Sequence, residues 1–259
     1  MEIAVRELAE TARNLRVPIH FAISDTKARY RRSALGPLWL TLGTAIGVAG
    51  LGFVWSELFK LEKSHVLPPL TIGLVTWQLI AGCLTEAPAV FYRQESLIKN
   101  QRIPTFSLSL QLVLRQVVNF AHNSIVILAI VAFYEPAGLL YLPLALLGAV
   151  LVALTLWGLA QAVGYLGARY RDIEPLVISF LPILFFLSPV LYTPQQIGAR
   201  SSIILFNPAA YWISVIRDPL LGKIPPLSTY VWVALIAAAI WLIALQATQI
   251  GRRKLPYWI

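Results

Sequence analysis

The sequence has little charge and a single cysteine. Only 13% of its 259 residues are Asp, Glu, Lys or Arg, whereas a typical soluble domain has about a quarter. Because Cys83 is the one cysteine, the chain cannot form an internal disulfide or a CxxC metal site. His20, His65 and His122 lie far apart in the sequence, so we expect no metal centre.

Motifs for nucleotide hydrolysis are also missing. The sequence contains no GxxxxGK[ST] phosphate loop, no GxGxxG turn, no HExxH and no GxSxG. We therefore expect a chain that is not itself an enzyme and holds no cofactor. Any uphill transport must take its energy from a partner protein or an ion gradient.

Long apolar runs dominate what remains. The chain is 58% hydrophobic, and residues 137–168 contain no Asp, Glu, Lys, Arg or His. A helix rises about 1.5 Å per residue and the bilayer hydrocarbon is roughly 30 Å thick, so such runs are long enough to cross a membrane. We predict an all-α polytopic membrane protein with six transmembrane helices, at about 34–59, 67–92, 104–134, 138–168, 175–193 and 228–250.

The positions of the basic residues predict the orientation. Lys and Arg exceed Asp and Glu by a net charge of +9, but they gather at the ends of the apolar runs rather than in a nucleic-acid-binding patch. Most of them fall in four segments, 1–33, 93–103, 169–174 and 251–259. An excess of Lys and Arg marks the cytoplasmic side, so both termini and the tail 251–259 are predicted to be cytoplasmic.

Residues 1–259 are predicted to form a single transmembrane domain. Two of its segments are not expected to cross the membrane. Residues 1–33 form a cytoplasmic interfacial region, in which a helix over 3–22 places Leu8, Ala12, Leu15 and Ile19 on one apolar face. Residues 194–227 contain an apolar stretch that is too short to cross. We predict re-entrant periplasmic helices there, before the last span.

Three features are candidates for function. The segment from Glu95 to Arg102 predicts a short amphipathic helix. The segment either docks into a groove of a partner protein or is a loop without a function of its own. On the span 104–134, polar residues recur at helical spacing on one face. Polar groups at this depth rarely face lipid. They either join helices, with Arg115 paired to Glu86, or form a hydrophilic wall of a translocation pathway. The two roles are compatible. The residues of this face are Gln111, Arg115, Asn119 and His122.

Aromatic residues of the first and fifth spans are the third feature. We expect them to cluster toward the outer half of the membrane. They either face lipid and the core or stack on the C–H faces of sugars. These residues are Phe53, Trp55, Phe185, Phe186 and Tyr192.

Between Arg29 and Trp39 the chain carries the run R-Y-x-x-S-x-L-G-x-L-W, and it thereby resembles the membrane subunits of ABC-2 type polysaccharide exporters. Further landmarks follow in order along nearly the whole chain. These are Leu97-Ile98-Lys99 before Pro104, Ala168 to Ile173, Ser188 to Tyr192, Asn207-Pro208 and Arg217 to Gly222.

The resemblance implies a half-transporter of the bacterial inner membrane. Two copies of the chain would form a homodimer with two copies of a separate ABC ATPase, which would bind ATP and Mg. The cargo would be an undecaprenyl-linked polysaccharide, most often an O antigen. The alternatives are a capsular polysaccharide, a teichoic acid, or a small lipid or drug.

The resemblance also assigns roles to residues. The ATPase-coupling helix would comprise Glu95, Leu97, Ile98, Lys99 and Arg102. The cytoplasmic mouth would comprise Arg29, Tyr30, Arg31 and Arg32, which either hold the lipid pyrophosphate or only anchor the chain. The translocation path would comprise Trp39, Phe53, Trp55, Arg115, Phe185, Phe186 and Tyr192, and the cytoplasmic gate Arg169, Arg171 and Asp172.

Two rival classes are disfavoured by the residues. A membrane-embedded glycosyl or acyl transferase needs an intramembrane base, and only His122 is placed for that role. An ion-coupled secondary transporter predicts inverted repeats, and we find none in the sequence.

The predicted orientation can be tested with reporter fusions. Alkaline phosphatase is active only outside the cytoplasm, so a fusion after Ser64 should be active and a fusion after Ile259 inactive. Phosphatase activity at both positions would contradict the orientation.

Overall fold

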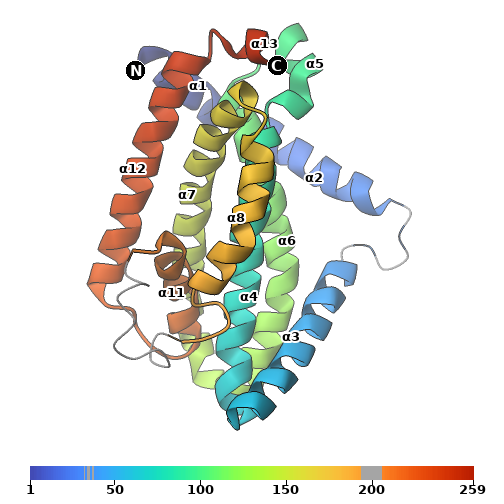
Figure 1. Cartoon of the computed structure of the whole chain (residues 1–259), viewed down its shortest axis with the longest axis vertical. Helices are drawn as coiled ribbons and strands as arrows, with labels where there is room; N and C mark the ends of the chain where they lie inside the picture. Colours follow the sequence, from blue (N-terminus) through green and yellow to red (C-terminus); the bar gives the residue numbers. More distant parts are fainter. Residues whose placement is uncertain (32, 34–35, 37, 194–205) are drawn as a thin grey trace.

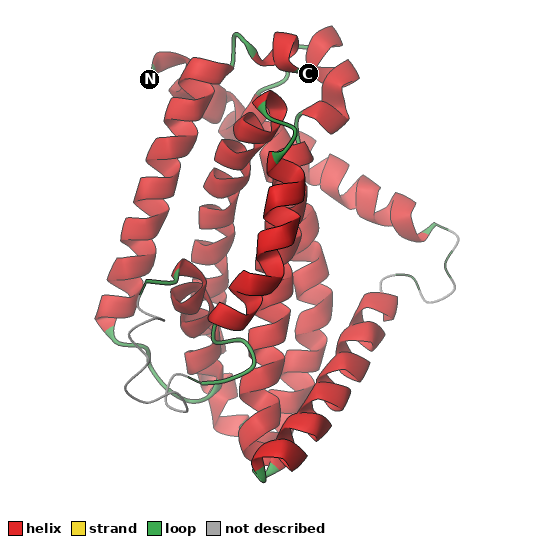
Figure 2. Ribbon diagram, viewed as in Figure 1, coloured by secondary structure: helices red, strands yellow, loops and turns green. Residues whose placement is uncertain are grey.

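The structure is a computed structural model, and it describes residues 1–31, 33, 36, 38–193 and 206–259. The described chain consists of helices joined by short loops (Figure 2). Both termini lie at one end of the helical bundle (Figure 1), which we call the terminal end; the opposite end is the distal end. Termini at the same end are what an even number of crossings requires.

Five described helices are long and apolar enough to cross a membrane. They agree with the first four predicted spans and with the last. They are α3 (Leu38–Phe59), α4 (Lys63–Glu86), α6 (Thr105–Tyr134), α7 (Leu142–Arg169) and α12 (Leu227–Gly251). The sequence predicted these helices well because each is an uninterrupted apolar run of roughly 20 residues or more.

The fifth predicted span, 175–193, is shorter in the structure. It is α8 (Ile173–Leu187), whose 15 residues extend only about 22 Å. The helix ends because Ser188 is extended, with ψ 146°, as expected for a residue that precedes a proline such as Pro189. The crossing by this segment therefore remains a prediction.

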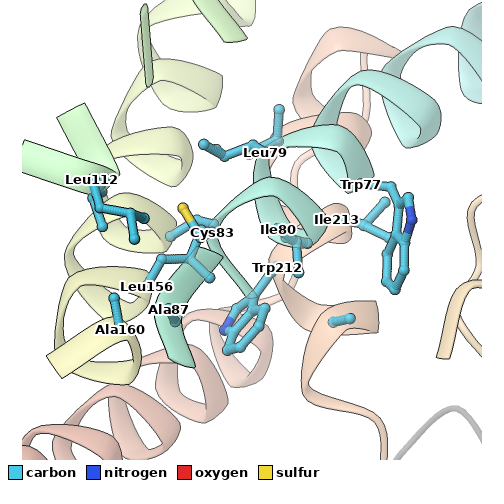
Figure 3. Close-up of a cluster of buried hydrophobic side chains, with 14 of the residues drawn as sticks. Trp77, Leu79, Ile80, Cys83, Ala87, Leu112, Leu156, Ala160, Trp212 and Ile213 are labelled. Carbon is cyan, nitrogen blue, oxygen red and sulfur yellow. The ribbon is translucent and has the colours of Figure 1, made fainter. Parts of the chain in front are cut away.

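The core of the bundle is centred on α4. Most of its length is buried, and it contacts α3, α6, α7, α8 and α11 (Pro208–Leu220). In Figure 3, Trp77 and Cys83 of α4 lie in one apolar cluster with Leu112 of α6, Leu156 of α7 and Ile213 of α11. Because α4 is enclosed by its neighbours, the other spanning helices present most of their surface outward.

Of the predicted re-entrant segment 194–227, the structure describes α11, and residues 194–205 lie outside the described residues. The re-entrant course itself stays a prediction. Helix α11 packs closely on α7, since a Cβ on Gly148 would lie 2.3 Å from the carbonyl oxygen of Val215. Asn207 caps α11 by accepting from the amide of Ala209 at 3.0 Å, and its Nδ2 donates to the carbonyl of Leu187 at 3.2 Å. The asparagine thus joins the end of α8 to the start of α11.

The N-terminal region differs from the single helix predicted over 3–22. It forms α1 (Glu2–Arg13) and α2 (Arg16–Tyr30), separated at Asn14, whose φ of −119° and ψ of 40° are not helical. The face of α1 that packs on the bundle carries Glu7 and Thr11, whereas much of the predicted apolar face is exposed. In a membrane, an apolar face can point outward while polar groups find partners inside the protein.

Short helices complete the part of the chain that the structure describes. They are η1 (Ala87–Ala89), η2 (Tyr92–Gln94), α5 (Glu95–Asn100), η3 (Pro136–Tyr141) and α13 (Leu255–Trp258). The predicted amphipathic helix over Glu95 to Arg102 is α5, and it ends two residues early because Gln101 is extended, with ψ 145°. Arg102 therefore lies beyond the helix.

Candidate functional site

The exposed surface of α5 is charged. Lys99 donates to Glu95 at 2.6 Å, and this hydrogen bond lowers the pKa of the Glu95 carboxyl. Ile98, which is one of the residues expected in the coupling helix, is not available on the surface of α5. Only 7% of Ile98 is exposed, so it anchors α5 to the rest of the chain, while Leu97 is half-buried. The surface available to a partner is thus formed by Glu95, Lys99 and Arg102, with part of Leu97.

A wide cavity of about 1020 Å³ opens beside α5 at the terminal end of the bundle. Its walls come from α1, from the α5–α6 connection and from the segment after α12. Charged side chains of both signs line it, among them Arg6, Glu10, Lys99, Arg102 and Arg253. Charges arranged in this way suit a protein surface of mixed charge.

One buried carboxylate attaches α1 to the other elements that line this cavity. Glu7 accepts hydrogen bonds from the amide and the hydroxyl of Thr105, at 3.1 and 2.6 Å, and forms an ion pair with Arg252. Arg252 also donates to the carbonyl of Ile103 at 3.2 Å. Sequence reasoning missed this network. Little in the sequence points to it, because α1 carries three acids, Glu2, Glu7 and Glu10, and their spacing does not single out Glu7.

The predicted gate residues lie at the end of α7 and just beyond it. The guanidinium carbon of Arg171 lies 3.9 Å from the ring centroid of Tyr92. Arg93 donates to Glu174 at 2.9 Å, and the hydroxyl of Tyr92 also donates to Glu174. These contacts tie the α7–α8 connection to the segment just before α5. Sequence analysis did not identify Tyr92 and Glu174.

The other two gate residues are not part of this junction. Arg169 stacks over Trp258 of α13, with 5.4 Å between its guanidinium carbon and the ring centroid. Asp172 is exposed at the start of α8, and its side chain makes no capping hydrogen bond there.

The pair predicted between Arg115 and Glu86 is present, which confirms that part of the analysis of α6. Arg115 also lies 3.6 Å from the carboxylate of Asp25. Gln111 donates to the same carboxylate at 2.7 Å. Asp25 belongs to α2, so the polar groups of α6 attach both α2 and α4.

A row of amides continues from this ion pair along α6. Gln116 donates to Glu86 at 2.9 Å, and Asn119 donates to Gln116 at 3.1 Å. One helical turn further, Asn123 donates to Gln78 of α4 at 2.7 Å. The row includes three residues that the sequence analysis did not select, Gln78, Gln116 and Asn123.

His122 does not join the row of amides. Its Nδ1 lies 2.8 Å from the carbonyl of Val118 in the same helix. The predicted polar face therefore holds for Gln111, Arg115 and Asn119 only.

The predicted aromatic residues of α3 and α8 do not form a single cluster. Trp55 and Tyr192 line one distal pocket of about 320 Å³. Phe185 packs edge-to-face on Trp77, with 5.6 Å between the ring centroids. Phe53 and Phe186 are exposed instead.

The predicted cytoplasmic mouth is described only in part. Arg29 and Tyr30 belong to the last turn of α2, and Arg31 is exposed at its end. Arg32 lies outside the described residues. Among the residues that the structure describes, no group of three or more His, Cys, Asp or Glu is arranged to hold a metal ion.

Comparison with known proteins gives a consistent result. The model of the ABC-2 type transporter family matches residues 22–221. The chain is 27% identical over 203 residues to an O-antigen export system permease protein RfbA of Klebsiella pneumoniae, covering 75% of this chain and 76% of the relative. A relative of the same name in Myxococcus xanthus is 26% identical over 192 residues, covering 71% and 72%.

The Arg115–Glu86 pair allows a test of stability. The Glu86→Gln variant should lower the free energy of unfolding by roughly 2 kcal/mol or more, because it removes the carboxylate that pairs with the guanidinium of Arg115 at membrane depth. The measurement is the thermal midpoint of the detergent-solubilised protein.

Glu95→Gln is the matched control for this test. It breaks the exposed pair with Lys99 and should change the stability by less than about 1 kcal/mol. Equal shifts of the thermal midpoint in the two variants would mean that the Arg115–Glu86 pair stabilises the protein no more than the exposed pair does.

Proposed function

Because this chain belongs to the ABC-2 type transporter family, we propose that it is the membrane permease subunit of an ATP-driven exporter of undecaprenyl-linked polysaccharide, with O antigen as the cargo. The observation that carries the proposal is the family match over residues 22–221, together with relatives named as O-antigen export permeases. The family is the membrane component of transporters, which agrees with a chain that has no phosphate loop. The whole chain then acts as one membrane domain, with both termini on the cytoplasmic side of the inner membrane.

The coupling surface is assigned to α5 and Arg102. In this assignment the terminal end faces the cytoplasm, and a separate ATPase seats on Glu95, Lys99 and Arg102 beside the wide cavity. The burial of Ile98 supports the assignment, because a helix that receives force must be attached to the domain that it moves. ATP and Mg are held by the ATPase.

Force on α5 has a direct route to α8. Arg93 and Tyr92 lie just before α5 and both contact Glu174 near the start of α8. Arg171 stacks on the same tyrosine. In our mechanism, ATP binding shifts α5, and this junction carries the movement to α8, which opens the path.

The path lies at the interface of two copies of the chain. The aromatic rings of Phe53 and Phe186 are exposed in the single chain, so a second copy can cover them or a sugar can stack on them. Aromatic faces grip C–H surfaces without a fixed register, which suits a polymer that slides. At the cytoplasmic entrance, Arg31 and its basic neighbours hold the pyrophosphate of the lipid.

The test is complementation of a strain that lacks this gene. The wild-type chain should restore surface O antigen and co-purify with the ATPase. The double variant Lys99→Glu, Arg102→Glu should abolish both, because it reverses two exposed charges of the coupling surface without touching the core. The readouts are immunodetection of surface polysaccharide and ATPase recovered with the tagged chain.

Lys223→Glu provides the matched control for ATPase binding. It reverses an exposed charge that lies outside α5, beside the distal pocket, and should leave the ATPase bound. Normal surface O antigen in the deletion strain would refute the proposed function. Normal ATPase binding by the double variant would refute only the coupling surface.

A further inference from the structure

A polar pocket without charge lies among α3, α4 and α6, halfway along α6. We call it the amide pocket, and its volume is about 360 Å³. None of its described lining residues carries a charge. The residues that matter here are Trp39, Thr44, Gln78, Gln116, Asn119 and Asn123.

The amides are held in place before any ligand arrives. Asn119 donates to Gln116, which in turn donates to Glu86. On the opposite wall, Gln78 donates to Thr44 at 3.3 Å. Groups that are already oriented lose little conformational entropy when they bind, so the amide pocket is organised as a binding site rather than as loose packing.

One acceptor in the amide pocket is unused. Asn123 is 6% exposed, and its Nδ2 donates to Gln78 at 2.7 Å. Within the described part of the chain, Oδ1 of Asn123 is buried and accepts no hydrogen bond. A buried acceptor without a donor costs about 1–3 kcal/mol, and such an exception needs an explanation. A ligand that brings a hydroxyl group would supply the donor.

The chemistry of the lining selects the class of ligand. A phosphate would need cations, and an acyl chain would leave the amides unpaired. Amides both donate and accept, as hydroxyl groups do. Trp39, of which 59% is exposed, adds an indole ring to the lining, and its negative π surface attracts the C–H groups of a pyranose ring. The pocket volume falls in the range of roughly 300–1,000 Å³ that is usual for small ligands.

We propose that the amide pocket is a sugar subsite, in which Asn123 Oδ1 accepts from a hydroxyl of the cargo glycan while Trp39 stacks on its ring. This inference rests on the proposed function, because the exported polysaccharide is the source of the sugar. The subsite lies deep in the membrane domain, so it receives the glycan after the lipid headgroup has been captured at the cytoplasmic entrance.

The experiment measures protection of a pocket thiol in membranes. Gly43 lines the pocket, and a Cβ added there meets no atom within 4 Å, so a Gly43→Cys variant places a thiol in open space. Background labelling is low, since the native Cys83 is buried. The host strain carries a catalytically inactive ATPase, so that glycan accumulates at the exporter. Its matched strain lacks the transferase that adds the first sugar to undecaprenyl phosphate.

We expect a methanethiosulfonate reagent to label the Gly43→Cys variant at least about threefold more slowly in the glycan-producing membranes. Adding Asn123→Leu should weaken glycan binding by up to about tenfold, the effect of one buried hydrogen bond, and so remove most of the protection. Trp39→Ala, at an exposed position, should weaken it too. Ser124→Ala on the same helix removes a hydroxyl that donates to the carbonyl of Phe120 within α6, and should preserve it.

Gly50→Cys is the matched labelling control on α3, since it is also open and does not line the pocket. Equal labelling of the Gly43→Cys variant in the two strains overturns the sugar subsite. If that labelling is equally slow in both strains relative to Gly50→Cys, the occupant of the pocket is lipid. If the inactive-ATPase strain accumulates no internal glycan, the proposed function itself fails, and the subsite fails with it.

Discussion

In lipid, every polar side chain has to find its partner inside the protein, and this constraint organises the bundle. Arg115, near the middle of a membrane-spanning helix, meets Glu86 and lies close to Asp25. Pairing at this depth is required because an isolated charge in hydrocarbon costs several kcal/mol. The pair fixes α6 against α4 and α2, and the amides that follow extend the same attachment along α6.

The same requirement shapes the terminal end. Helix α1 turns Glu7 toward Thr105 and Arg252 and leaves much of its apolar surface outside. In water, the opposite arrangement would be favoured, because burial of apolar surface would dominate. The N-terminal segment is thereby attached to α6 and α12, next to the surface that we assign to the ATPase.

The sequence predicted those parts of the fold that depend on length and mean polarity. Helices α3, α6 and α12 begin and end within a few residues of their predicted bounds, since an apolar run of this length has one stable outcome in a bilayer. The sequence predicted helix ends and side-chain burial less well where they depend on residues packed nearby. The end of α8 at Leu187 depends on Pro189, and the anchoring of Ile98 depends on tertiary packing. The amide pocket joins three helices, and the spacing of polar residues on α6 alone could not indicate Gln78.

The central claim is that this chain supplies the path while a separate ATPase supplies the energy. Reconstitution in liposomes tests it directly, with labelled undecaprenyl-linked polysaccharide added on the ATPase side. We predict that glycan reaches the other side only when the chain, the ATPase and ATP are all present, and that the chain alone hydrolyses no ATP. Transport by the chain alone, or transport that continues with a catalytically inactive ATPase, would contradict the account.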